Sequence, residues 1–248
     1  MLQLISNLFV VMNSIKITET TRMYSVKAVT LIGIFAISFL ISAGSVIHAA
    51  ATSEFQVTIN AGTLSVDIAD STSSYASVAS PTVTFSAQNF SFSCGTTTGT
   101  LGTAAEAIYV QNPDAADSGW TVAIAASDPT DVWDSAGTDF DFNDPTTAGC
   151  ADSVDADAVA GQLTVDASGG TLGTGDCASC VTTNISLGSS NAFEEGVTDS
   201  VTILTAAAGS DDIGDWALTG VSLSQTIPGE QPAASDYTLP MTLSVVAS

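Results

Sequence analysis

The segment at residues 119–126, Gly-Trp-Thr-Val-Ala-Ile-Ala-Ala, constrains the fold most, because bulky and small side chains alternate along it. Trp120, Val122 and Ile124 fall on one side of this alternation, and the residues between them are small or polar. Successive side chains of a β-strand point to opposite faces, so a period of two predicts a strand with one face against a core. We expect Trp120 to anchor that core. The alternative is an exposed indole that serves as a ligand-binding platform.

The same alternation recurs in short segments along the chain, separated by turns rich in glycine, asparagine and aspartate. These segments are residues 55–59, 64–68, 83–85, 90–92, 107–110, 162–165, 201–204, 221–224 and 237–245. No amphipathic helix of convincing length and no internal repeat interrupts them. The pattern predicts an all-β protein, an antiparallel β-sandwich of the Ig-like, Greek-key type.

Residues 51–248 are long enough for one such domain. We expect turns at residues 60–62 and 99–102. Between residues 127 and 199 the alternation weakens while glycine and aspartate accumulate, which predicts one long acidic insertion. Pro240 interrupts the last alternating segment, and proline cannot donate to a strand ladder, so that strand should lie at a sheet edge or carry a bulge.

The N-terminal region has the pattern of a secretory signal peptide at residues 23–50. Lys27 precedes an apolar run at residues 28–46, and three alanines at 49–51 offer small side chains for cleavage. Residues 1–22 then read as an upstream start-site extension or a long n-region. An uncleaved anchor is the alternative, since the apolar run is long enough to span a bilayer. We expect an exported, extracellular or cell-surface protein with no membrane insertion after cleavage.

Charge excludes whole classes of partner. The basic residues of the chain are Lys16, Arg22, Lys27 and His48. Of its 26 acidic residues, 25 follow His48. Nucleic-acid binding requires Lys and Arg to neutralise phosphates, so nucleic acid is excluded as a partner. A mature chain without histidine or lysine also lacks a Ser-His-Asp triad, a Cys-His pair and a lysine nucleophile.

Three short motifs resemble those of bacterial WxL-domain surface proteins. They are Ala-Gly-Thr-Leu at residues 61–64, Gly-Trp-Thr-Val at 119–122, and a Tyr-led, Pro-containing segment at 237–243 preceded by Gln-Thr-Ile-Pro at 225–228. Leu243-Ser244-Val245 stands where the family has its second Trp-x-Leu, while a literal Trp216-Ala217-Leu218 lies upstream. The resemblance implies a secreted protein held non-covalently at a cell surface, in contact with wall glycan or other surface proteins.

Two kinds of ligand site follow from residues 128–157, where nine aspartates fall. The alternating run Asp-Phe-Asp-Phe-Asn-Asp offers calcium the oxygen ligands of Asp139, Asp141, Asn143 and Asp144, although it is not an EF-hand. A solvated acidic loop is the alternative. Trp133 and Phe140 beside these acids, with Trp120, are candidate glycan-binding residues. A paired-carboxylate glycosidase is the remaining enzymatic interpretation.

Cys94, Cys150, Cys177 and Cys180 favour disulfides in an exported chain. Of the three connectivities, we expect Cys150 with Cys177 and Cys94 with Cys180. A zinc site is disfavoured because Cys177-x-x-Cys180 has no second matching pair. The sequence therefore predicts a non-catalytic secreted or cell-surface protein, an adhesion, coat or surface-assembly module stabilised by calcium. Its expected partners are wall glycan, other surface proteins or further copies of itself.

Overall fold

The structure is a computed structural model that describes residues 56–114, 118–144, 150–152, 157–208 and 213–248. The chain divides into two compact units, Met1–Thr58 and Ile59–Ser248. The upstream extension, the signal peptide and its cleavage site lie outside the described residues. Within the described residues, no helix has the length and apolar character needed to cross a membrane.

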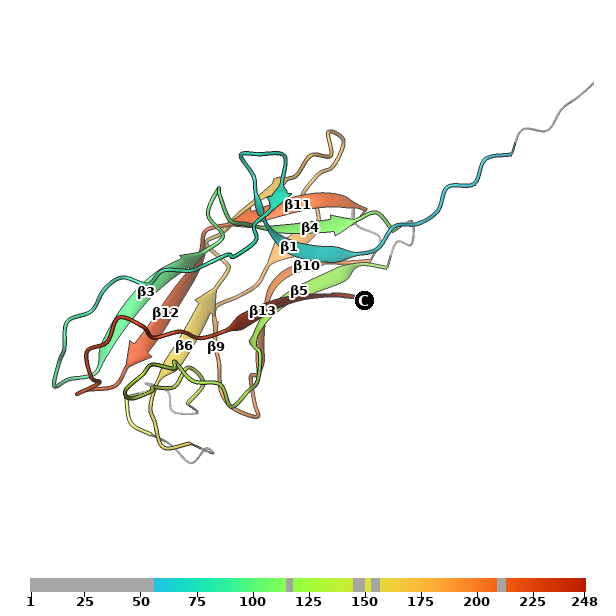
Figure 1. The fold of residues 1–248 in the computed structure, drawn as a ribbon. Helices are drawn as coiled ribbons and strands as arrows, with labels where there is room; N and C mark the ends of the chain where they lie inside the picture. Colours follow the sequence, from blue (N-terminus) through green and yellow to red (C-terminus); the bar gives the residue numbers. More distant parts are fainter. Residues whose placement is uncertain (1–55, 115–117, 145–149, 153–156, 209–212) are drawn as a thin grey trace, which may run out of the picture. The chain divides into compact units, whose positions relative to one another are not determined.

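The described part of the chain holds thirteen strands in three antiparallel sheets (Figure 1). The five-stranded sheet has the order β2 (Ala76–Ser77), β1 (Ser65–Asp70), β4 (Ala107–Asn112), β11 (Gly214–Thr219), β7 (Thr171–Thr174). The β5 sheet has the order β13 (Met241–Ala247), β5 (Trp120–Ala126), β10 (Ser200–Ala206), β8 (Ile185–Leu187). The β12 sheet has the order β3 (Gly95–Leu101), β12 (Val221–Ile227), β6 (Gln162–Asp166), β9 (Asn191–Ala192). The all-β, antiparallel class predicted from the sequence is confirmed.

Sharp bends carry the chain between the β12 sheet and the five-stranded sheet. Gly102 joins β3 to β4 and Gly220 joins β11 to β12, with φ of +83° and +78°. This left-handed region is open to glycine but costly for residues with a Cβ. The bends lie side by side, since Gly220 N donates to Gly102 O at 2.7 Å. The turn expected at residues 99–102 is therefore wrong in extent, because residues 99–101 complete β3.

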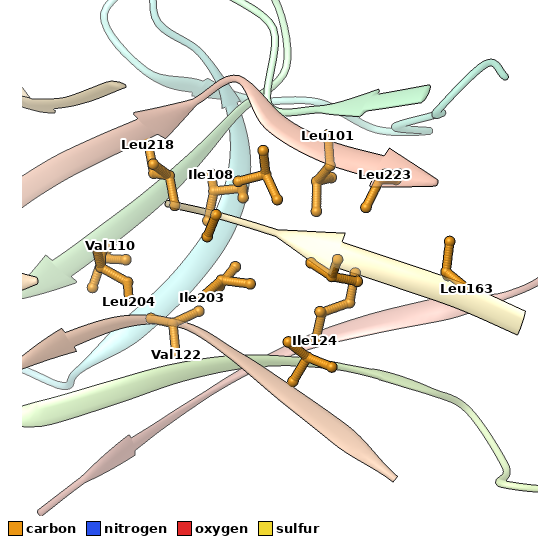
Figure 2. Packing of buried hydrophobic residues seen from close by; sticks show 14 of the residues in the cluster. Leu101, Ile108, Val110, Val122, Ile124, Leu163, Ile203, Leu204, Leu218 and Leu223 are labelled. Carbon is orange, nitrogen blue, oxygen red and sulfur yellow. The ribbon is translucent and has the colours of Figure 1, made fainter. Parts of the chain in front are cut away.

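One hydrophobic cluster joins side chains from all three sheets. Figure 2 shows Val122 of β5 and Ile203 and Leu204 of β10 near Val110 of β4 and Leu218 of β11. The Trp120 and Trp216 rings meet in this cluster with centroids 5.4 Å apart, and both side chains are fully buried. Trp120 is therefore a core residue and not an exposed platform. The alternating burial of β5, with Trp120, Val122 and Ile124 inside, is the pattern predicted from the sequence.

The acidic region at residues 127–199 is not an insertion outside the sheets. It supplies β6, β7, β8 and β9, which join all three sheets. Of these four strands, only β6 was predicted from the sequence, as the alternating segment at residues 162–165. The others have four residues or fewer, too short for a period of two to stand out.

Three predicted strands do not form. Residues 56–59, 83–85 and 90–92 lie outside any strand, and Gly62 N donates to Pro113 O at 3.1 Å in place of the expected hairpin turn. Alternation gives a segment a strand-like surface but no partner, and a strand forms only where another edge pairs with it. The last strand begins at Met241 and not at Tyr237. It lies at an edge of its sheet, as Pro240 predicts.

Both disulfide pairings differ from those expected. Cys94 pairs with Cys150 and Cys177 with Cys180, at Cα–Cα distances of 5.5 and 5.4 Å. Cys94 immediately precedes β3, whereas the Cys177–Cys180 turn lies in the β7–β8 connection against β11, where a Cβ on Gly214 would meet Cys180 Sγ. The two bridges therefore lie beside strands of different sheets, β3 and β11. The sequence separation of the cysteines did not reveal this.

Candidate binding site

Four aromatic side chains from distant parts of the sequence meet along one wall of a hollow, which we call the aromatic hollow: Phe85, Trp133, Phe140 and Tyr237. Trp133 stacks on Phe140 with ring centroids 5.6 Å apart and an interplanar angle of 12°. Phe85 meets Trp133 edge to face at 5.3 Å, and Tyr237 meets Phe140 at 4.9 Å. Such contacts hold aromatic rings in fixed orientations.

Hydrogen bonds fix the Trp133 indole in the wall. Its Nε1 donates to Gln225 Oε1 at 2.9 Å, and Gln225, fully buried on β12, donates through Nε2 to Asp141 O at 2.9 Å. The backbone pairs Trp133 with Phe140 and Asp134 with Thr238 as isolated antiparallel bridges. The half-buried indole is thus held by β12 and by the segment that leads into β13.

The aromatic hollow has a volume of about 540 Å³. Most of the remaining lining comes from the segment before β3, which also carries Phe85, and from the connection between β12 and β13, which also carries Tyr237. The remaining lining residues include Val83, Phe90, Ile227, Pro228 and Pro232 among apolar ones and Gln88, Asn89, Ser91, Gln231 and Ser235 among polar ones. Among the described residues that line the hollow, none is acidic. The site therefore combines aromatic faces with uncharged hydrogen-bonding groups.

An exposed aromatic pair stands beside the hollow. Phe90 and Phe92 meet edge to face at 5.2 Å and are 52% and 80% exposed. Phe90 lines the hollow, whereas Phe92 does not. Phe92 therefore offers a matched aromatic side chain outside the site.

The structure unites two of the three predicted ligand-binding residues. Trp133 and Phe140 both line the hollow, but Trp133 is half-buried whereas Phe140 is only 4% exposed and packs behind the indole, and Trp120 lies in the core. Sequence reasoning missed Phe85, Tyr237 and Gln225, which come from segments about 50 to 100 positions away along the chain. The alternation at residues 83–85 marked Phe85 as a strand residue only. Gln225, in the middle of an alternating strand, gave no sign of its contact with an indole.

The four predicted calcium ligands are close in sequence but have separate local roles. Asp139 Oδ1 accepts from Ser135 N at 3.1 Å, Asp141 Oδ1 accepts from Phe142 N at 2.6 Å, and Asn143 Nδ2 donates to Pro129 O at 2.7 Å. Asp141, Asn143 and Asp144 are buried. Across the described residues, the acidic members of this set do not form a group of three whose ligand atoms lie within 4.8 Å of one another. The calcium site stays a prediction.

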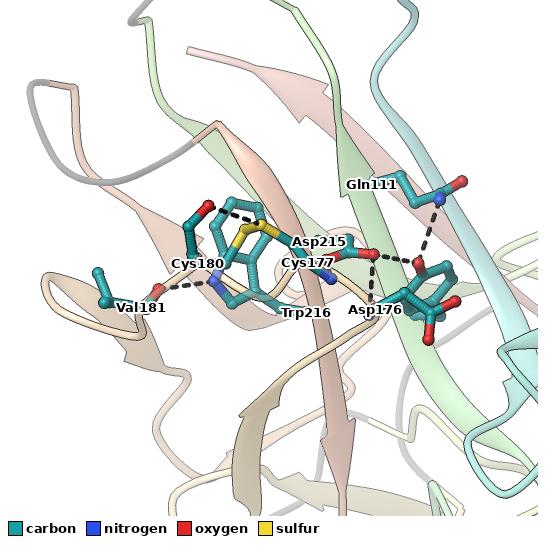
Figure 3. The surroundings of a disulfide bond; sticks show 9 residues. Gln111, Asp176, Cys177, Cys180, Val181, Asp215 and Trp216 are labelled. Carbon is teal, nitrogen blue, oxygen red and sulfur yellow. Dashed lines mark hydrogen bonds between the residues drawn. A yellow bond between two sulfur atoms is a disulfide. The ribbon is translucent and has the colours of Figure 1, made fainter.

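The grouping that does meet this distance is Cys177, Cys180 and Asp215 (Figure 3). The two sulfurs form a disulfide, so this is a structural cluster in the oxidised chain. Asp215 Oδ1 accepts from Cys177 N at 2.9 Å, and its Oδ2 accepts from Asp176 N at 3.1 Å and from the Tyr109 hydroxyl. Trp216 Nε1 donates to Val181 O at 2.8 Å just beyond the disulfide. These bonds hold the turn against β11.

Burial raises the pKa of Tyr109, and the hydrogen bond to Asp215 raises it further. Burial also raises the pKa of Tyr75, and the negative charges of Asp176 and Asp215 raise it further. The Tyr75 ring stacks on the Tyr109 ring with centroids 4.3 Å apart. A second hollow of about 300 Å³ opens beside this pair and is lined by Asp67 and Asp176 as well. It differs from the aromatic hollow in that carboxylates line it.

Comparison of the chain with protein-family models, with curated proteins and with solved structures found no match.

Proposed function

We propose that this chain is a non-catalytic extracellular module that binds an uncharged glycan of a cell envelope through the aromatic hollow. It serves adhesion to, or coating of, that surface. In this proposal its sheets form an Ig-like, Greek-key β-sandwich and its N-terminal signal directs export. The resemblance to WxL-domain proteins, carried by the motifs at residues 61–64, 119–122 and 237–243, supports a surface location.

One observation carries the proposal: a hollow of about 540 Å³ has four aromatic rings along one wall and no acid among its described lining residues. The mature chain holds 25 acidic residues, so an uncharged concave surface is unusual in this molecule. Ligand sites are typically concave and largely apolar with a few placed polar groups. Sugar rings offer apolar C–H faces to the partly exposed aromatic rings, behind which Phe140 is buried. Their hydroxyls can bond to the exposed side chains of Gln88, Asn89 and Ser91.

The same observation disfavours a glycosidase at this site. Hydrolysis of a glycosidic bond requires a pair of carboxylates about 5 to 10 Å apart across the scissile bond. Because the described lining of the hollow contains no Asp or Glu, a glycan bound there meets no general acid. Binding without turnover is the chemistry these residues support.

Sedimentation with purified insoluble cell walls tests the proposal. Trp133→Ala should weaken wall binding about tenfold or more, since a central aromatic anchor commonly carries 1–2 kcal/mol or more of binding energy. Phe92→Ala removes an exposed aromatic outside the hollow and should leave binding unchanged. Asn89→Ala, an exposed change at the lining, should weaken binding without loss of melting temperature. Equal wall binding by all four proteins would place the wall contact elsewhere.

A further inference from the structure

We propose that copies of this chain assemble by strand addition, in which residues 56–61 of one copy pair with the outer edge of β13 of the next. This interaction is separate from glycan binding in the aromatic hollow, and neither residues 56–61 nor β13 line that hollow.

The acceptor is β13, the end strand of the β5 sheet. Its seven residues all pair with β5, from Met241 opposite Ala126 to Ala247 opposite Trp120, with no shift in register. Among the described residues, no strand pairs with its other side (Figure 1). A long unpaired edge presents a row of backbone donors and acceptors, which favours pairing with a further strand.

The other edge strands are less suited to this role. β2, β7, β8 and β9 have four residues or fewer. β3 is as long as β13, but residue Ser86 already bonds to its edge. Ser86 N donates to Thr98 O at 2.8 Å, and Ser86 O accepts from the Thr97 hydroxyl at 2.5 Å. Irregular chain therefore already covers β3.

Alternate side chains of β13 leave a place for one more apolar strand. Met241, Leu243 and Val245 pack against the core and remain only partly buried, whereas Thr242 and Ser244 are exposed on the opposite face. An added strand at the unpaired edge would cover the parts of Leu243 and Val245 that remain exposed. Burial of apolar surface drives such an addition at about 25 cal/mol per Å².

The donor reads as a strand but forms none in the structure. Residues 56–59, Gln-Val-Thr-Ile, alternate polar with β-branched apolar side chains. Val57 and Ile59 are 83% and 89% exposed, which is costly for two large apolar residues in water. Because Val57 and Ile59 share a face in an extended strand, both would lie beside Leu243 and Val245 when the segment pairs with β13.

Charge favours this pair of segments. Copies that each carry 25 acidic residues after His48 repel one another. Residues 55–66 and 237–248 contain no Asp or Glu, so their pairing brings no carboxylates directly opposite each other. Like charges directly opposite in a ladder would destabilise it. Salt screens the remaining repulsion, so assembly should strengthen as ionic strength rises.

Sedimentation velocity of the exported product of the full chain tests the proposal. The protein should form oligomers that grow with concentration and with salt. Val57→Asp combined with Ile59→Asp should weaken association about tenfold or more, because two charges would enter the apolar face. Gln56→Asp combined with Thr58→Asp adds the same charge to the opposite face and should weaken it far less. A chain that stays monomeric at all concentrations and salts, or equal loss in both double variants, would overturn the proposal.

A peptide then identifies the acceptor edge. The V57D/I59D chain cannot donate but keeps β13 intact, so a synthetic peptide of residues 55–64 should bind it and slow hydrogen exchange of the amides of residues 241–247. The same peptide with Asp at both positions should not bind. Protection confined to another strand, or no binding, would overturn the assignment of β13. Wall binding in the sedimentation assay should persist in V57D/I59D, so the two functions fail independently.

Discussion

Carboxylates in this chain are stabilised by hydroxyl and backbone donors, because no Lys, Arg or His follows His48. Asp70 accepts from the hydroxyl and N–H of Thr72, and these bonds lower its pKa. Asp128 with Thr130 and Asp166 with Ser168 repeat this arrangement, and the pKa of each carboxyl is again lowered. Buried Asp215 accepts three hydrogen bonds, from the Tyr109 hydroxyl and from the N–H groups of Asp176 and Cys177. Local donors thus replace ion pairs.

Tyr109→Phe should destabilise the chain by about 1–3 kcal/mol at neutral pH, because it removes a donor from the buried Asp215 carboxylate. Urea unfolding measures this free energy. Tyr237→Phe, at a partly exposed hydroxyl, is the control and should cost less. Equal costs for the two variants would contradict the role assigned to Asp215.

The raised pKa of Tyr109 predicts alkaline instability of a defined sign. Its folded-state pKa lies above the unfolded value of 10.0, so its contribution to stability is complete below pH 10.0 and is lost as pH rises toward the folded pKa. Stability of the native chain should therefore fall above pH 10.0, and that of Tyr109→Phe should fall less steeply. Parallel stability curves for the two proteins in this range would show that Tyr109 is not responsible.

At the scale of elements, period-two alternation located the strands with one buried face. β5, β6, β10 and β12 follow it, and Trp120, Val122 and Ile124 are the clearest case. β11 was missed, and its residues 215–218 are all buried, as are residues 107–110 of the central strand β4 beside it. Residues 56–59 alternate but have no partner, so the pattern overpredicted a strand there. Pairing depends on contacts between distant segments that a local period does not contain.

The two disulfides should differ in their effect on stability. In the loop-entropy model, the Cys94–Cys150 bridge, with a sequence separation of 56, contributes about 4 kcal/mol, whereas Cys177–Cys180, with a separation of 3, contributes about 2 kcal/mol. Cys94→Ser with Cys150→Ser should therefore lower the unfolding free energy more than Cys177→Ser with Cys180→Ser. Urea titration of both double variants measures the difference, and the reverse order would contradict the pairing.

At the scale of the whole molecule, net charge sets the response to ions. Simple salt should raise the melting temperature smoothly by screening repulsion among 25 carboxylates. The predicted calcium site adds a second, saturable stabilisation that sodium and magnesium lack. At matched ionic strength and for a Kd of about 0.1–1 mM, 10 mM calcium should raise the free energy of unfolding by about 1.4–2.7 kcal/mol. Asp139→Asn should reduce that increment. Equal melting temperatures in the three salts would show that the acidic residues are only solvated.

Two of the four aromatic residues of the hollow could be predicted from the sequence. Trp133 and Phe140 stood out as aromatics within an acidic run, which is why both were expected to contact ligand. The indole depends on Gln225 and the rest of the wall on Phe85 and Tyr237, which only the paired sheets bring together. Local composition identified two of the residues, and the fold assembled the site.

Tryptophan fluorescence tests the binding claim most directly, because the chain has three tryptophans and Trp120 and Trp216 are fully buried in the core. Soluble uncharged oligosaccharides, released from the walls that the chain sediments with, should change the emission of Trp133 saturably. Phe92→Ala should give the same titration, and Trp133→Phe should give none. An unchanged emission, or an equal change in Trp133→Phe, would contradict glycan binding in the aromatic hollow.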